Sequence, residues 1–182
     1  MIHIRQAIPD DAAGISEMHV ETWRTAYKGI MPDDVLANMS YEKRELMWRK
    51  ILAAGSDETV LVAEDPQNRI IGFASGGRER GGLPVFKGEL YGIYILAEWQ
   101  RQGIGRRLVH ELATRLIARG FNSMFLWALE KNTACRFYER LGGKKSASRI
   151  VKFGSADLVE IAYGWNNLHA LAESTAEKQN PV

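Results

Sequence analysis

The chain contains one cysteine, Cys135, and four histidines among its 182 residues. A single thiol excludes an internal disulfide, and the histidines show no spacing typical of metal ligands. We therefore expect no metal site. One free cysteine is also typical of a protein in a reducing compartment, so the composition favours the cytoplasm.

Long apolar runs are also missing, because no segment approaches the roughly 20 residues needed to cross a bilayer. The N-terminus lacks the basic and then apolar pattern of a secretion signal. A formal net charge of +2 is too small to indicate nucleic-acid binding. We expect neither a membrane nor a nucleic-acid partner, and the length fits one domain with a full core.

Apolar periodicity predicts strands and helices along the chain. Strands are expected over residues 2–5, 59–63, 70–75, 89–96, 123–129, 146–153 and 158–165. Helices are expected over residues 9–28, after Pro32 and after Ser40. Two more are expected from the glycine turn at Gly103 and Gly105 to about Arg119, and after the cap residue Asn132. Gly76 to Gly88 is typical of a loop, and a polar, frayed tail is expected after about His169. This order favours an α/β (α+β) fold, in which a mixed, mostly antiparallel central sheet has helices on both faces.

The most informative segment runs from Ile93 to Arg107, where a buried strand enters a glycine turn and a helix begins. The first amides of a helix have no intrahelical partner, and the positive end of the helix dipole attracts anions. Three arginines, Arg101, Arg106 and Arg107, lie beside the glycines, so we expect a phosphorylated ligand rather than a plain connecting turn. Leu108 stands where a dinucleotide-binding loop needs its third glycine, so the pattern does not favour that class of site. The Gly-x-x-x-x-Gly-Lys-Ser/Thr pattern of a nucleoside-triphosphate loop does not occur in the sequence.

The spacing Gln-x-x-Gly-x-Gly at positions 100, 103 and 105 resembles the acetyl-coenzyme A loop of the GNAT superfamily of N-acetyltransferases. The resemblance extends over roughly residues 2 to 166. It implies one GNAT domain over residues 1–168, a polar tail at 169–182, and acetyl-CoA as the co-substrate. The main chain that would hold the pyrophosphate is that of Arg101, Gln102, Gly103, Ile104, Gly105 and Arg106. The main chain that would pair with the pantetheine arm is that of Ile93, Tyr94 and Ile95.

A second segment, Asn132 to Gly143, resembles the family's Asn…Ala…Phe-Tyr-Glu…Leu-Gly segment. The resemblance implies that Asn132 contacts the pantetheine arm and that Tyr138 protonates the leaving thiolate. A phenol that is neutral at pH 7 can fill that role, although packing in an amphipathic helix is the alternative. The step from Asn132 to Tyr138 is one residue shorter than is usual in the family, and Gly143 replaces the usual aromatic residue. Either Asn132 or Tyr138 is then off its family position, and the flanking residues favour Tyr138 as the one in register.

Attack by an amine requires its neutral form, and a lysine-like amine is neutral only about one time in a few thousand at pH 7. Glu89 is the candidate base, and by period two we expect it to share a face with Tyr91, Ile93 and Ile95. The resemblance implies that this glutamate acts directly or through water, whereas a solvated carboxylate at a strand end is the alternative. Some relatives use a glutamate in the next strand, where Trp127 stands here.

An aromatic stripe of His19, Trp23 and Tyr27 recurs on one face of the first expected helix. It fits core packing, and it would also suit an apolar or cationic amine bound in a cleft. The leading hypothesis is an N-acetyltransferase that moves an acetyl group from acetyl-CoA to a primary amine, on a small molecule or a peptide, by direct attack in a ternary complex. A non-catalytic acyl-CoA-binding or regulatory module and a protein N-terminal or lysine acetyltransferase are the alternatives. The Gly76 to Gly88 loop could serve as a lid or in a homodimer contact.

Overall fold

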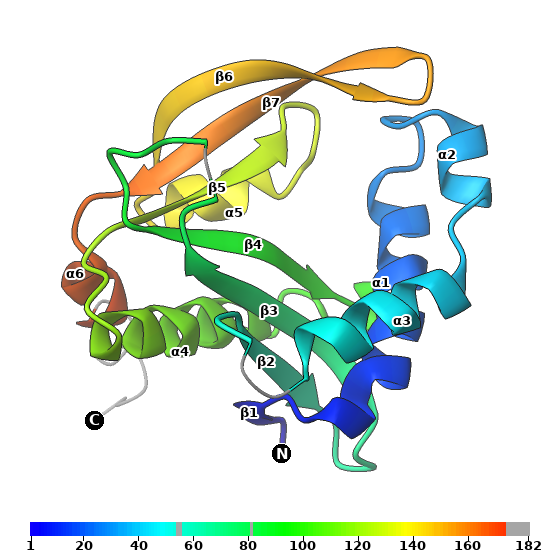
Figure 1. Ribbon diagram of the computed structural model, residues 1–182, viewed down its shortest axis with the longest axis horizontal. Coiled ribbons are helices and arrows are strands. Elements are labelled where there is room, and N and C mark those ends of the chain that lie inside the picture. The colour runs from blue at the N-terminus through cyan, green and yellow to red at the C-terminus, as the bar shows by residue number, and fades with distance from the viewer. Residues whose placement is uncertain (54–55, 81, 174–182) are drawn as a thin grey trace.

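A mixed sheet forms the centre of the computed structural model, which describes residues 1–53, 56–80 and 82–173 (Figure 1). In chain order its strands are β1 (His3–Gln6), β2 (Thr59–Glu64), β3 (Ile70–Arg78), β4 (Gly88–Ile95), β5 (Met124–Leu129), β6 (Lys144–Phe153) and β7 (Ala156–Trp165). Their order across the sheet is β1-β2-β3-β4-β5-β7-β6. Neighbouring strands are antiparallel except β4 and β5, which are parallel. The predicted mixed, mostly antiparallel sheet is confirmed.

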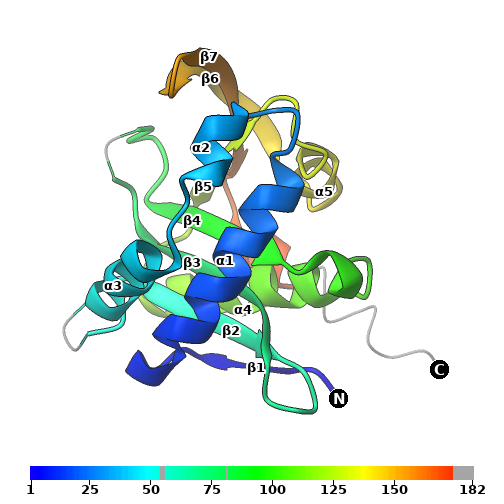
Figure 2. The same cartoon turned by 90° about the vertical axis from the view of Figure 1, so that its right-hand side faces the viewer.

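Helices cover both faces of this sheet (Figure 2). In chain order they are α1 (Ala12–Ala26), α2 (Asp33–Ala37), α3 (Tyr41–Ile51), α4 (Ile104–Ala118), α5 (Cys135–Arg140) and α6 (Leu168–Glu173), with 3-10 turns at Pro9–Asp11 and Ala97–Trp99. Successive residues of β3 face opposite sides of the sheet, one covered by α1 and the other by α4. Phe73 contacts His19 of α1, whereas a Cβ on Gly76 would meet Leu112 of α4. Helix α3 packs on α1, and α6 packs on α4.

The apolar stripe of α4 fixes this helix on the sheet. Ile104, Leu108, Leu112 and Leu116 recur at steps of four and are at most 2% exposed. A helical period of 3.6 places such residues on one face, and burial of each stabilises the fold by about 1.5–3 kcal/mol. Gly120, with φ +85°, follows the end of the helix as predicted. The core therefore holds the N-terminal end of α4 at the end of β4.

Strand β4 leaves its neighbour β5 after two residue pairs. The two strands pair only at Gly88↔Met124 and Glu89↔Phe125. On the other edge of β4, the register with β3 shifts at Tyr91, which is the extra residue of a β-bulge. A bulge bends the strand that carries it, and β4 continues to Ile95 without further pairing to β5. A wedge-shaped gap therefore opens in the middle of the sheet.

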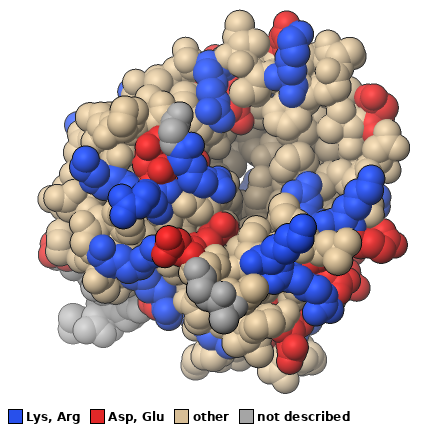
Figure 3. All heavy atoms as spheres, viewed as in Figure 1, with Lys and Arg blue, Asp and Glu red and all other residues tan. Residues whose placement is uncertain are grey.

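The gap is bounded at its wide end by α1, α2 and the β6–β7 hairpin. Tyr27, Met31 and Leu36 form a buried cluster with Leu129 of β5, and residues of β6 and β7 pack around it. The Val35 side chain of α2 packs against Gly154 at the β6–β7 turn. Figure 3 shows a hollow between β4 and the β6–β7 hairpin on the face seen in Figure 1. This hollow is the entrance to the region where β4 and β5 separate.

Two sequence predictions need correction. Gly76 and Gly77 belong to β3 rather than to the predicted loop, because they pair with Leu90 and Glu89 of β4. The frayed tail expected after about His169 is wrong for residues 170–173, which belong to α6 (Leu168–Glu173), with Leu171 buried. The polar pattern concealed this short amphipathic turn. Residue 81 of the predicted loop and residues 174–182 of the predicted tail lie outside the described residues.

Candidate active site

The glycine turn before α4 presents a row of free amides. Gly103 is the N-cap residue of α4 with φ +81°, and Arg101 has φ +61°. The side chains of Gln100 and Gln102 brace the turn by donating to the carbonyls of Ile95, at 2.9 Å, and Glu98, at 3.2 Å. Within the described residues, no acceptor receives a hydrogen bond from the backbone amides of residues 101–106. These amides lie at the positive end of a 15-residue helix and can bind an anion.

Gly105 brings the two sequence motifs together. A Cβ on this residue would lie 3.1 Å from Ile95 Cδ1 and 3.2 Å from Phe137 Cζ. The absence of a side chain therefore lets α4 approach both the end of β4 and helix α5. The Phe137 and Tyr138 rings are 5.4 Å apart. The structure thus places Tyr138 in the helix next to the predicted phosphate loop.

The predicted strand edge is available for a ligand. Ile93, Tyr94 and Ile95 pair with β3 on one edge, and they lie beyond the last β4–β5 pair on the other. An extended chain of amides can add to such an edge as an extra strand. The strand edge and the free amides of residues 101–106 are thus the two features that the sequence predicted for binding the pantetheine arm and the pyrophosphate.

Tyr138 is buried and protonated. Burial raises its pKa well above the usual value, and the neighbouring Tyr27, Cys135 and Tyr163 raise the pKa further. Its ring lies 5.8 Å from that of Tyr163. Within the described residues its hydroxyl makes no hydrogen bond, so its proton is free for a ligand atom.

Asn132 does not cap α5 in the way predicted. The helix begins at Cys135, and the Asn132 Oδ1 instead accepts from the Ala134 amide at 2.9 Å in the preceding turn. The sequence step from Asn132 to Tyr138 is one residue shorter than is usual. Because Asn132 lies outside α5, this shorter step does not turn the two side chains to different faces of one helix. Asn132 and Tyr94 both interact with the Tyr27 hydroxyl, and both lower its pKa, which burial raises more strongly. Asn132 and Tyr138 therefore both border Tyr27.

The space beside Gly143 is filled by an aromatic ring of β7. A Cβ at this position would lie 2.7 Å from Trp165 Cζ2 and 3.0 Å from the carbonyl of Tyr138. The Trp165 indole donates to the Leu141 carbonyl at 2.9 Å. This contact ties the end of α5 to β7 and supports the helix that carries Tyr138.

Glu89 faces a different set of residues from the one predicted. The bulge at Tyr91 breaks the alternation. Ile95 therefore points to the α4 side, toward Gly72 and Gly105. Glu89 instead shares the opposite face with Tyr91, whose ring lies beside Gly77, the partner of Glu89 on β3. The prediction that Glu89 shares a face with Ile93 and Ile95 is wrong, because period two holds only in a strand without an inserted residue.

Glu89 lies at the narrow end of the gap, with 12% of its side chain exposed. It accepts from the Arg80 amide at 3.1 Å, and the Arg80 guanidinium is 3.7 Å away. Burial raises the pKa of Glu89, the amide and charge of Arg80 oppose this, and Glu79 adds to the increase. Burial also raises the pKa of the neighbouring Glu58. The site therefore contains two carboxyl groups with raised pKa values, which makes them stronger bases than usual glutamates.

The aromatic stripe of α1 meets β4 at Tyr94. The ring centroids of His19 and Tyr94 are 4.9 Å apart, those of Trp23 and Tyr94 are 6.3 Å apart, and the hydroxyls of Tyr27 and Tyr94 are 3.2 Å apart. His19 and Tyr27 are buried, whereas Trp23 is half-buried. The stripe is thus largely core, and it also forms the wall of the gap next to β4.

Two charged residues in this region were not found from the sequence. Arg44 of α3 lies 5.4 Å from the ring centroid of Trp23 and interacts electrostatically with Tyr94. Glu160 of β7 bonds to Arg149 at 2.7 Å and interacts electrostatically with Tyr27. Neither lies in a motif, and only the packing of α3 and β7 against the site reveals them.

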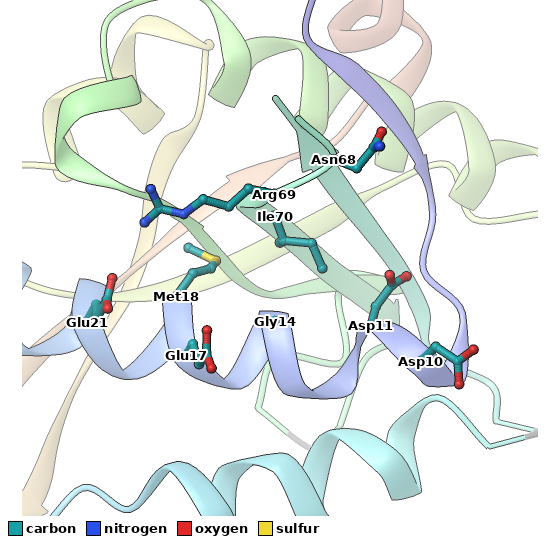
Figure 4. A pocket seen from close by; sticks show the side chains of 9 residues that line it. All are labelled: Asp10, Asp11, Gly14, Glu17, Met18, Glu21, Asn68, Arg69 and Ile70. Atoms are coloured by element: carbon teal, nitrogen blue, oxygen red, sulfur yellow. The ribbon is translucent and has the colours of Figure 1, made fainter. Parts of the chain in front are cut away.

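A separate cavity of roughly 300 Å³ lies between α1 and the β2–β3 hairpin (Figure 4). Its wall is acidic, with Asp10, Glu17 and Glu21 opposite Arg69. None of the predicted site residues lines it. Within the described residues no group of three or more potential metal ligands occurs, and no helix has the length and apolar character required to cross a membrane.

Residues 17–143 match the model of the acetyltransferase (GNAT) family. The chain is also 37% identical over 171 residues to the uncharacterized N-acetyltransferase YuaI of Bacillus subtilis (strain 168), and the match covers 94% of this chain and 96% of that protein. The chain therefore belongs to the GNAT acetyltransferase family. The predicted enzyme class, an acetyl-CoA-dependent acyltransferase, is confirmed.

Solved structures share the fold. The PaiA N-acetyltransferase of Thermoplasma acidophilum, solved in complex with coenzyme A, has a TM-score of 0.68 at 19% identity, with 88% of this chain and 98% of that chain covered. The yncA protein of Salmonella typhimurium, solved with its cofactor acetyl-CoA, has a TM-score of 0.68 at 23% identity, with 92% and 94% covered. These likenesses confirm the predicted GNAT fold.

Proposed function

We propose that this enzyme transfers the acetyl group of acetyl-CoA to a primary amine by direct attack in a ternary complex. One observation carries the proposal: the free amides of residues 101–106 adjoin the unpaired edge of β4, and Tyr138 lies in the next helix. A diphosphate, an amide-bearing arm and a thioester follow one another in acetyl-CoA. The amides, the strand edge and the phenol follow one another in the same order in the structure.

The loop and the strand hold the donor. The amides of residues 101–106 bind the pyrophosphate, and the side chains of Arg101 and Arg106 add positive charge beside it. The main chain of Ile93, Tyr94 and Ile95 pairs with the pantetheine arm, and the Asn132 side chain contacts it from the opposite side. A backbone amide of β4 also stabilises negative charge on the thioester oxygen during attack.

Bound acetyl-CoA supplies a thioester carbonyl as the electrophile. In the transfer, the amine nitrogen forms a bond to the acetyl carbon and the bond from that carbon to sulfur breaks. Tyr138 donates its proton to the departing sulfur. Its burial favours the protonated phenol, which is the form a general acid needs.

Glu89 accepts the proton of the attacking amine, directly or through water. Its position at the narrow end of the gap and its raised pKa support this role. Arg80 favours the ionised carboxylate of Glu89, because a neighbouring positive charge opposes protonation. His19, Trp23 and Tyr27 form the wall on the acceptor side.

A thiol-release assay with acetyl-CoA tests the proposal. The panel contains small amines, free amino acids, polyamines, aminoglycosides and peptides with free N-termini or lysines. Acetylation of a small amine, confirmed by mass spectrometry of the product, supports the proposal. Acetylation of peptides alone would make the protein a peptide acetyltransferase. Thermal stabilisation by acetyl-CoA without thiol release for any acceptor would support a non-catalytic acyl-CoA-binding module instead.

A further inference from the structure

We infer that the acceptor carries a compact anionic group, such as a carboxylate, and that Arg44 binds this group while the amine faces Tyr94 and Tyr138. This inference rests on the proposed function, since it identifies the chemical class of the amine. It assigns to helix α3 a substrate-binding role that the sequence motifs do not indicate.

Arg44 is a half-buried cation without a carboxylate partner in the described residues. Its guanidinium lies over the Trp23 ring, and among the residues that the structure describes it donates one hydrogen bond, to the Met47 sulfur at 3.7 Å. Other arginines around the gap are already paired with acids: Arg80 with Glu89 and Arg149 with Glu160. A partly buried guanidinium without an anion has lost hydration that nothing replaces, so a bound oxyanion would find an uncompensated charge.

The side chains around Arg44 include further N–H donors, and in the described part of the chain none of its neighbours there supplies a carboxylate. The Trp48 indole donates to Nδ1 of His19 at 3.3 Å, so the neutral imidazole carries its proton on Nε2. That Nε2 is buried and has no hydrogen-bond partner. The Trp23 Nε1 is also buried without a partner of normal hydrogen-bond geometry, although a weaker hydrogen-bonding interaction with Tyr94 lowers the pKa of that tyrosine. An unpartnered N–H on His19, a weakly bonded N–H on Trp23 and a guanidinium without a carboxylate partner in the described residues favour a ligand that supplies oxygen acceptors.

The positive charge of Arg44 lies near Tyr94, and the acids of the site lie elsewhere. Arg44 of α3 interacts electrostatically with Tyr94, whereas Glu89 lies where β4 still pairs with β5, and Glu160 of β7 interacts electrostatically with Tyr27. An acceptor with an oxyanion a few bonds from its amine would bind the oxyanion at Arg44 and place the amine at Tyr94 and Tyr138. Its anionic group would then extend toward α3. A plain alkylamine or a polyamine would leave Arg44 unpaired.

Matched acceptors test the inference. L-phenylalanine, its amide and phenethylamine share the ring and the amine, and only the first has a carboxylate; L-alanine and its amide form a smaller pair. The phosphonate analogue of alanine distinguishes a carboxylate from a general oxyanion. The wild-type kcat/KM for acid over amide is expected to exceed about tenfold, as for a charge-assisted hydrogen bond. The ammonium group of an amino-acid amide loses its proton more readily than that of the free amino acid. A difference in amine ionisation alone would therefore give the amide, not the acid, the higher kcat/KM.

Arg44→Gln is expected to bring this ratio close to one, and Arg44→Lys to retain part of it. The matched control is Arg49→Gln on the same helix, because Arg49 is exposed and paired with Glu45 at 2.6 Å; it should leave the ratio unchanged. Thermal unfolding and CoA affinity establish that each variant is folded. A wild-type ratio near or below one in every pair, or a ratio that Arg44→Gln leaves unchanged, would overturn the inference.

Calorimetry on protein saturated with CoA separates this inference from the proposed function. Acids that bind the wild type but not Arg44→Gln, without any thiol release, would support the anion site and contradict the proposed transfer. Thiol release from amines with no preference for an anionic group would support the transfer and overturn the anion site.

Discussion

The hydroxyl groups of Tyr27 and Tyr94 lie 3.2 Å apart, so a hydrogen bond joins the residue that caps the end of α1 to β4, beyond the point where β4 leaves β5. Asn132 and Tyr138, from the other side of the gap, both interact with Tyr27. A single tyrosine pair therefore connects the proposed acceptor wall with the residues that would contact the thioester. The expected effects of substitutions follow from this arrangement.

Tyr138→Phe removes the proposed proton donor without changing the shape of the ring. We expect kcat to fall by about 10²–10⁴, the usual contribution of a general acid, whereas the Kd for CoA stays within about twofold. Steady-state kinetics and calorimetry measure the two quantities.

Tyr163→Phe is the matched control for Tyr138→Phe, because the two rings are 5.8 Å apart and the Tyr163 hydroxyl donates to Glu139 instead. It should leave kcat nearly unchanged. Equal effects of the two substitutions would mean that Tyr138 acts only through packing.

Glu89→Gln removes the proposed base. The rate should fall with decreasing pH as Glu89 is protonated, and this limb should lie above the usual range of a glutamate because burial raises its pKa. In the variant the limb disappears, only ionisation of the amine remains, and kcat falls by about 10²–10⁴. A pH profile of kcat for both proteins provides the comparison.

Glu58→Gln controls for the loss of a carboxyl group from the same neighbourhood, since burial also raises the pKa of Glu58 and Arg80 interacts with both acids. It should keep the acid limb. A Glu89→Gln profile identical to that of the wild type would assign proton removal to water or to another group.

Gly103→Ala and Gly120→Ala each place an L side chain at a residue with positive φ, at opposite ends of α4. Both glycines have φ above +80°, and a Cβ at either would contact nothing within 4 Å. Each variant should lose about 1 kcal/mol of unfolding free energy, because an L side chain disfavours this conformation. Only Gly103→Ala should also weaken CoA binding, by about tenfold, as it disturbs the amides that would hold the diphosphate.

Urea denaturation and calorimetry would be performed on both glycine variants. Equal CoA affinity in the two would show that the turn before α4 takes no part in holding the ligand.

The buried His19 should make the unfolding free energy of the protein depend on pH. Burial, with a smaller effect of Arg44, lowers its pKa to about 3, and Tyr94 also packs against it. The native state keeps His19 neutral, whereas the unfolded state binds a proton below a pH of about 6.5. The unfolding free energy should therefore fall as the pH drops from about 6.5 toward 3, by up to about 1.4 kcal/mol per pH unit from this residue.

His19→Phe should flatten this part of the stability profile, whereas substitution of the exposed His169 by Gln should not. Urea denaturation at several pH values measures the slopes. A wild-type slope that His19→Phe leaves intact would contradict a buried neutral histidine.

The sequence was sufficient for the features that local chemistry determines. Gly103 and Gly105 predicted the turn and helix start, and the strand periodicity predicted the sheet. Tyr91 shows where such reasoning fails, because an inserted residue in a strand leaves no mark on the apolar pattern and yet changes the face on which Glu89 lies. Arg44 shows a second limit. That no carboxylate pairs with it among the described residues depends on how α3 packs against Trp23, which no spacing in the sequence encodes.

The most direct test of the central claim is hydrogen exchange at the amides of residues 101–106 with and without CoA. These amides have no protein acceptor in the described residues, so they should exchange rapidly in the free protein. We predict that saturating CoA slows their exchange markedly, together with that of residues 93–95, and leaves the α1–β3 cavity unchanged. Saturable CoA binding that leaves exchange at residues 101–106 unaltered would contradict the claim that these amides hold the diphosphate.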